Sequence, residues 1–126
     1  MSMSPIRRTA VVSAGLLAAV ALAGCSSGGA ATTVQVTSSA TECGIDPASA
    51  PAGSITFTVE NTGSQTTEFY VYEQDGTTIV GEVENIGPGL SRDLTVDLTE
   101  GAYVGACKPG MTGDGIRTDF DVTAAE

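Results

Sequence analysis

The strongest constraint on the fold is the alternation in residues 55–59, where isoleucine, phenylalanine and valine take every second position and threonine lies between them. A period of two residues is typical of a β-strand that buries one face. Similar short segments recur along the chain, separated by turn residues every eight to twelve positions. No helical periodicity occurs outside the first two dozen residues. The pattern predicts an antiparallel β-sandwich or barrel.

Strands are expected at seven places: residues 32–38, 55–59, 68–72, 77–83, 90–98, 102–106 and 116–122. Asp75-Gly76 gives the strongest hairpin signal. Residues 40–53 contain prolines and glycines at irregular spacing, and they are predicted to form a long connection. We therefore expect an all-β domain of about seven to eight strands.

The first residues have the features of an export signal. Arg7 and Arg8 precede an apolar run at residues 11–23, which is too short for a membrane span. The run ends in Leu22-Ala23-Gly24-Cys25, which resembles the lipobox of bacterial lipoproteins. We expect residues 1–24 to be a lipoprotein signal peptide, Cys25 to carry a lipid such as palmitate, and residues 25–31 to be a flexible tether. Residues 32–126 would then form one extracytoplasmic domain anchored to the membrane.

The net negative charge of the chain argues against nucleic acid as a partner. Removal of residues 1–24 would leave 102 residues with three basic and fifteen acidic side chains, a formal charge of −12. Such a surface repels nucleic acid and attracts cations. We expect a monomer that has no nucleic-acid partner and contacts the membrane through its lipid.

Histidine is absent from the chain. This excludes Ser-His and Cys-His nucleophile pairs, His-ligated zinc and histidine as a general acid or base. No glycine-rich phosphate loop occurs either. A protein that is not an enzyme is expected, and thiol, thioether, carboxylate and phenol groups are left as candidate metal ligands.

The loop after residue 106 carries two soft sulfur groups, Cys107 and Met111, in a glycine-rich turn. Thiolate and thioether ligands favour soft ions such as Cu(I). Apart from Cys25, however, the chain has only Cys43 and Cys107, and two cysteines in a small exported domain commonly form a disulfide. Both alternatives, a metal site and a disulfide, follow from the residues.

Three segments resemble a known family. These are Thr67-Glu68-Phe69-Tyr70-Val71, residues 82–90 (EVENIGPGL), and residues 106–117 with their Cys-Lys-Pro-Gly-Met run. Together they are similar to the EfeO-type cupredoxin-like domain, the N-terminal module of the periplasmic component of bacterial elemental-iron uptake systems. The resemblance implies a Greek-key β-sandwich that binds an iron or copper ion and passes iron toward an iron permease and a haem peroxidase.

The resemblance also implies roles for residues. Cys43, Glu68, Cys107 and Met111 are the metal-ligand candidates. Fe(III) would favour Glu68 together with Glu84, Asp114 or a tyrosine oxygen. Glu68 would point between the sheets if Tyr70 and Tyr72 are core residues, and outward if Phe69 and Val71 face inward. The three tyrosines, Tyr70, Tyr72 and Tyr103, are expected to be core or rim aromatics.

Two departures from the family narrow the expected function. The chain has no helical imelysin-like domain after the module, and it lacks the two histidines of blue-copper sites. We expect a stand-alone, lipid-anchored module that binds iron or copper in iron uptake and is not a blue-copper electron carrier. The alternative is an interaction scaffold on the cell envelope, closed by a Cys43–Cys107 disulfide and free of metal.

Overall fold

A computed structural model describes residues 31–126. The predicted signal peptide, the lipidation at Cys25 and nearly all of the tether lie outside these residues. The described part contains nine strands and one short 3-10 helix, η1. The elements are β1 (Thr32–Ser38), β2 (Cys43–Asp46), β3 (Ser49–Pro51), β4 (Gly53–Asn61), β5 (Thr67–Glu73), β6 (Ile79–Ile86), β7 (Ser91–Leu98), β8 (Gly101–Cys107), η1 (Pro109–Met111) and β9 (Ile116–Thr123).

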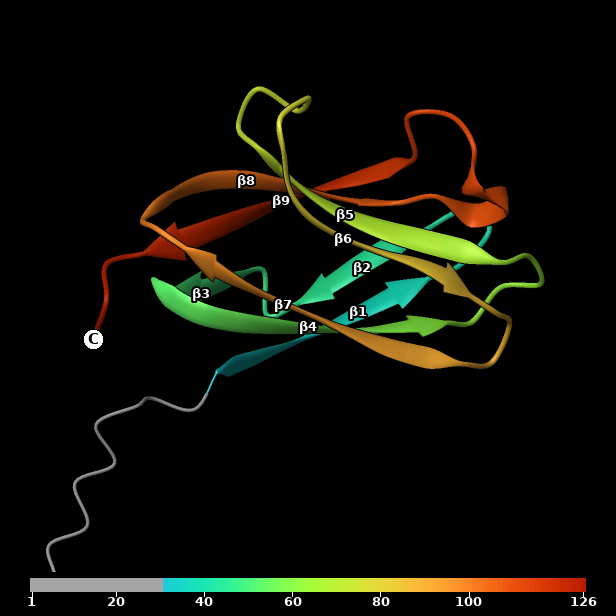
Figure 1. The fold of residues 1–126 in the computed structure, drawn as a ribbon, viewed down its shortest axis with the longest axis horizontal. Coiled ribbons are helices and arrows are strands. Elements are labelled where there is room, and N and C mark those ends of the chain that lie inside the picture. The colour runs from blue at the N-terminus through green and yellow to red at the C-terminus, as the bar shows by residue number, and fades with distance from the viewer. Residues whose placement is uncertain (1–30) are drawn as a thin grey trace, which may run out of the picture.

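The strands form two sheets that pack face to face (Figure 1). One sheet has four strands in the order β2-β1-β4-β7, and the other has five in the order β3-β9-β8-β5-β6. Pairing is antiparallel except between β1 and β4 and between β3 and β9. The all-β sandwich expected from the sequence is confirmed.

The core lies between the sheets and is built on three phenylalanines. The ring of Phe57 in β4 lies 5.5 Å from that of Phe69 in β5 and 5.2 Å from that of Phe120 in β9, measured between centroids. All three side chains are almost completely buried. Burying a phenylalanine stabilises the fold by roughly 1.5–3 kcal/mol, so these contacts join the two sheets strongly.

Strands β2 and β3 occupy residues that were predicted to be an irregular connection, and that prediction is wrong. In β2, Cys43 and Ile45 turn inward, and the strand pairs with β1 through Val36 and Ile45. In β3, Ala50 is buried and pairs with Val122 of β9. These strands have only four and three residues. Their pairing depends on distant partners, which a local pattern cannot reveal.

No helix in residues 31–126 has the length and apolar character needed to cross a membrane. The loop after β8, which holds η1, lies at the right-hand end of the sandwich in Figure 1, and the C-terminus lies at the left-hand end. The ends of β1, β4, β6 and β8 and the starts of β2, β5, β7 and β9 meet at the η1 end. Most of the candidate site residues are found there.

Candidate functional site

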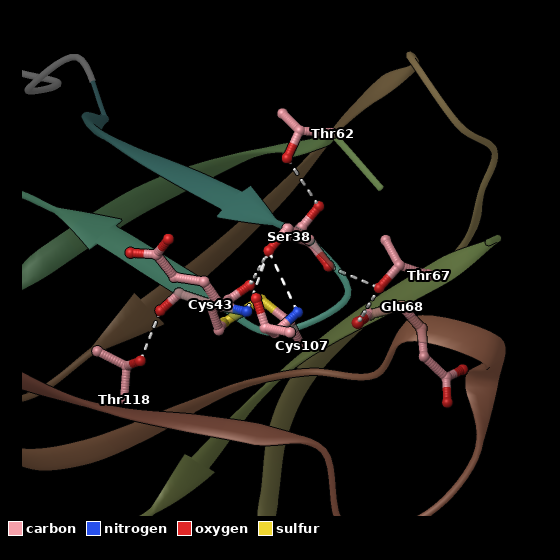
Figure 2. The surroundings of a disulfide bond; sticks show 10 residues. Ser38, Cys43, Thr62, Thr67, Glu68, Cys107 and Thr118 are labelled. Carbon is pink, nitrogen blue, oxygen red and sulfur yellow. Dashed lines mark hydrogen bonds between the residues drawn. A yellow bond between two sulfur atoms is a disulfide. The ribbon is translucent and has the colours of Figure 1, made fainter. Parts of the chain in front are cut away.

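Cys43 and Cys107 form a disulfide with their Cα atoms 5.5 Å apart (Figure 2). Cys43 begins β2 in the four-stranded sheet, and Cys107 ends β8 in the five-stranded sheet. The bond therefore ties one sheet to the other. Both residues are buried, with exposed fractions of 4% and 0%. Of the two alternatives left open by the sequence, the structure contains the disulfide.

Buried polar groups surround this bond, and each has a partner. The hydroxyl groups of Ser38 and Thr67 are hydrogen bonded at 2.8 Å. The Thr118 hydroxyl donates to the carbonyl oxygen of Cys43 at 2.6 Å. Among the described residues, no buried side-chain nitrogen or oxygen lacks a hydrogen-bond partner. The interior at this end is therefore satisfied without an ion.

Asn61 holds the neighbouring loops in place. Its Nδ2 donates to the carbonyl oxygens of Gln65 at 2.7 Å and Ile86 at 2.8 Å, and its Oδ1 accepts from the backbone N–H of Gly63 at 2.9 Å. Its backbone N–H also donates to the carbonyl oxygen of Leu90. One buried side chain thus connects the β4–β5 loop to the end of β6.

Glu68 does not join the cysteines. Phe69 and Val71 belong to the core between the sheets, so Glu68 turns to the outer face of the five-stranded sheet. This is the second of the two orientations that the sequence allowed. Figure 2 shows the Glu68 carboxylate directed away from the disulfide. Glu68 is nevertheless only 6% exposed. The predicted grouping of Glu68 with Cys43 and Cys107 is therefore wrong for this structure.

Instead, Glu68 lies in an acidic group around a buried phenol on the outer face. We call the set Glu68, Tyr70, Glu82 and Glu84 the tyrosine–glutamate cluster. The Tyr70 hydroxyl donates to Glu84 Oε1 at 3.4 Å. Glu82 lies opposite Tyr70 on the neighbouring strand β6. The pKa of Tyr70 is raised, first by burial and then by the negative charges of the three glutamates.

The cluster is built by the pairing of β5 with β6 and β8. Tyr70 and Tyr72 stack at 5.7 Å between ring centroids, over Ala106 of β8. The 3-10 helix packs beside β5, with the Gly110 N–H donating to the carbonyl oxygen of Thr66 at 2.8 Å. These contacts bury aromatic rings on a face that would otherwise be exposed to solvent. They also explain why every residue of β5 except Glu73 is buried.

The other two predicted ligands are exposed. Met111 ends η1 with 38% of its surface exposed and with a positive φ of 57°. Asp114 is exposed in the following loop, and its carbonyl oxygen accepts a hydrogen bond from Arg117 Nε at 3.2 Å. Within residues 31–126, no three side chains of histidine, cysteine, aspartate or glutamate converge as a ready-made metal site.

The two-sheet β-sandwich is the fold expected of a cupredoxin-like protein. A family model for the cupredoxin-like domain matches residues 12–118, and the chain belongs to this family. No curated protein matches the sequence. Auracyanins are among the solved structures that share the fold. Auracyanin from the photosynthetic bacterium Roseiflexus castenholzii, in its dithionite-reduced state, is 23% identical and has a TM-score of 0.59, covering 75% of this chain and 99% of its own. Auracyanin A, a blue copper protein from Chloroflexus aurantiacus, is 13% identical with a TM-score of 0.55, covering 75% of this chain and 100% of its own.

The residues present do not fit a blue-copper centre. Such a centre needs two imidazole ligands and a cysteine thiolate. This chain has no histidine, and the sulfur of Cys107 is bonded to that of Cys43. Neither Cys43 nor Cys107 therefore has a free thiolate to offer a metal ion in this structure. Any metal chemistry of this chain must therefore use another set of groups.

The sequence grouped Glu68 and Glu84 with a tyrosine oxygen as possible Fe(III) ligands, but it did not single out Tyr70, because the three tyrosines were assigned to the core or rim without a choice of sheet face. Tyr103 does lie in the core, with its hydroxyl donating to the Thr99 carbonyl oxygen at 2.8 Å. Tyr70 and Tyr72 form a separate cluster on the other side of the sheet. One signal was available: in β5, Phe69 and Val71 are the more apolar pair. Giving them the inward face would have placed Glu68 and Tyr70 together on the outer face of the sheet.

Proposed function

We propose that this chain is a lipid-anchored, extracytoplasmic module that binds iron(III) as cargo in bacterial iron uptake. The observation that carries the proposal is the tyrosine–glutamate cluster. It presents a buried phenol and three carboxylates on one face, two of them exposed. Carboxylate and phenolate oxygens are hard ligands, and a hard trivalent cation prefers them to sulfur.

The negative charges of the tyrosine–glutamate cluster favour the binding of a cation there. Burial and three nearby negative charges make it costly to ionise Tyr70 in the metal-free protein. A bound trivalent cation reverses that balance, because it stabilises the phenolate and neutralises the glutamates. Binding requires Tyr70 to lose its proton and the exposed Glu82 and Glu84 side chains to move inward. The affinity for iron therefore rises with pH.

The resemblance to the EfeO-type domain supports iron rather than copper as the cargo. In this proposal, the partners are the iron permease and the haem peroxidase of such a system. The lipid at Cys25 holds the module at the membrane. The module carries out no catalysis. The disulfide has a separate, structural role. Cys43, Cys107 and Met111 are not ligands in the oxidised protein.

The direct experiment is a competition titration of the purified protein with ferric citrate. The wild-type protein should develop visible phenolate-to-iron charge-transfer absorption, which Tyr70→Phe removes. Glu68→Gln and Glu84→Gln together should weaken binding by at least about tenfold, because charge neutralisation at short range costs more than 1.4 kcal/mol. The matched control is Asp97→Asn with Glu100→Gln, two exposed acidic residues at the C-terminal end of the sandwich. Equal losses in both double variants, or no charge-transfer band, would contradict the proposal.

The alternative is an interaction scaffold without metal, favoured by the Cys43–Cys107 disulfide between the sheets. It predicts that Tyr70→Phe and the Glu68→Gln, Glu84→Gln pair leave function in cells unchanged, while loss of Cys43 impairs folding. The two accounts are separated by the phenotype of Tyr70→Phe, which keeps the ring and removes only the hydroxyl.

A further inference from the structure

Lys108 is the only lysine of the chain, and it lies over the tyrosine–glutamate cluster. Its Nζ is 3.9 Å from the centroid of the Tyr70 ring and 5.9 Å from that of Tyr72. An ammonium group at this distance is attracted by the face of the ring. The Lys108 backbone N–H donates to the carbonyl oxygen of Glu68 at 2.8 Å, so Lys108, just after the end of β8, lies beside Glu68 of β5.

The positions of the other basic residues bear on the role of the contact between Lys108 and Tyr70. The three basic residues of residues 31–126 all border the same region. Arg117 places its guanidinium carbon 5.0 Å from the Tyr72 ring centroid, and Arg92 Nη1 donates to the carbonyl oxygen of Glu84 at 2.8 Å. Of the three, only Lys108 covers the ring of Tyr70 itself. The basic side chains of the described residues therefore contact the tyrosine rings and the backbone carbonyl of Glu84 on β5 and β6.

We propose that Lys108 is the internal counter-cation of the tyrosine–glutamate cluster, and that it must leave the Tyr70 ring before an external cation can bind. The second part of this inference rests on the proposed function, whereas the first part does not. Lys108 follows Cys107 and precedes η1, so its long side chain can swing outward without any change in β8. The Lys108 ammonium would then compete with the incoming cation for the cluster. Only an ion of higher charge than the ammonium would displace it.

Two consequences distinguish this role from simple packing. A cation held over the Tyr70 ring, whose hydroxyl is bonded to Glu84, should react slowly with amine-directed reagents. It should react faster once the nearby carboxylates are neutralised or once iron takes its place. A substitution that removes the charge of Lys108 but keeps an apolar side chain of similar length should raise the affinity for iron. A substitution that keeps the positive charge should not raise it. Packing of the stem alone predicts neither result.

The first experiment measures acylation of Lys108 by an N-hydroxysuccinimide ester with peptide mass spectrometry, which assigns the product because no other lysine exists. In the metal-free protein, Lys108 should react several-fold more slowly than in urea-unfolded protein. Glu68→Gln with Glu84→Gln should restore most of the rate, and the matched Asp97→Asn, Glu100→Gln variant should not. Equal rates in all folded variants would overturn the role as counter-cation.

The second experiment titrates ferric citrate into wild-type protein, Lys108→Met and Lys108→Arg. The affinity of Lys108→Met should exceed that of wild type by about tenfold, and Lys108→Arg should bind no more tightly than wild type. Equal affinities in all three would overturn the displacement step while leaving iron binding intact. If none of the three binds iron, the proposed function and the displacement step both fail, and the acylation rates alone decide whether Lys108 compensates the carboxylates.

Discussion

Glu68 and Cys107 lie on adjacent strands, but their side chains face opposite sides of the five-stranded sheet. Cys107 pairs in register with Phe69, and both belong to the core between the sheets. Glu68, one position earlier, turns to the outer face beside Tyr70. The soft sulfur atoms and the hard oxygen atoms of the candidate site are thereby separated by a sheet. This separation is consistent with a structural role for the disulfide, and it places the proposed cation site on the outer face.

Loss of the disulfide should destabilise the fold without disturbing the cluster. The bond closes a loop between cysteines that are 64 positions apart, which corresponds to about 4 kcal/mol on the chain-entropy model. Urea unfolding of Cys43→Ala with Cys107→Ala should show a loss of that size. An unchanged midpoint would show that the bond does not stabilise the native state. The double variant leaves neither half of this bond behind as an unpaired thiol.

Asn61 should be among the most sensitive polar residues. Asn61→Ala removes three hydrogen bonds and leaves the buried carbonyl of Ile86 without this donor. A cost of about 2–4 kcal/mol is expected from the lost bonds. Thr56→Ala is a suitable control, because it removes one exposed hydroxyl–hydroxyl contact with Thr95. Thermal unfolding of the two variants measures the difference, and similar midpoints would contradict the role given to Asn61.

Gly105 should not tolerate a side chain. A Cβ at this position would lie 2.4 Å from Ile45 Cδ1 and 3.1 Å from Phe69 Cε2. The isoleucine can shift, but the phenylalanine ring is fixed by the core, so Gly105→Ala should cost about 1–3 kcal/mol by overpacking. Denaturant unfolding tests this. If Gly105→Ala is as stable as wild type, the two sheets are packed less tightly at β8 than the structure indicates.

The β5–β6 hairpin should give the protein a measurable acid dependence. Hydrogen bonds from the Thr78 hydroxyl and from the backbone N–H groups of Thr78 and Thr77 lower the pKa of Asp75 from 3.8 to about 2. Because the pKa is lower in the folded state, the stabilisation is complete above pH 3.8 and is lost as the pH falls through about 2. The difference in unfolding free energy between wild type and Asp75→Asn should shrink over that range. A constant difference would show that the Asp75 carboxylate does not act through its charge.

The sequence predicted most of the architecture because strand alternation is a local signal. Residues 55–59 lie within β4 and keep the predicted alternation, with Ile55, Phe57 and Val59 buried. The predicted hairpin at Asp75-Gly76 lies between β5 and β6. The pairing of β2 with β1 and of β3 with β9 could not be predicted, because it depends on contacts between distant segments.

The candidate site was harder to predict than the fold because it depends on which face of β5 is buried. All but one of the β5 residues are buried, so burial does not separate the two faces, and only the greater apolar character of Phe69 and Val71 favours them as the inward pair. The buried position of Glu68 results from the stacked rings of Tyr70 and Tyr72 and from the packing of η1 beside β5. A strand pattern that is apolar on both sides carries too little information to place a single carboxylate.

X-ray absorption at the iron edge tests the central claim most directly, because it reports the atoms bound to the metal. Protein loaded with ferric citrate and freed of excess iron should show a first shell of oxygen atoms only. That shell should be lost with the bound iron in Tyr70→Phe and kept in the matched Asp97→Asn, Glu100→Gln control. Sulfur in the first shell, or iron retained in full by Tyr70→Phe, would contradict the assignment of the metal to the tyrosine–glutamate cluster.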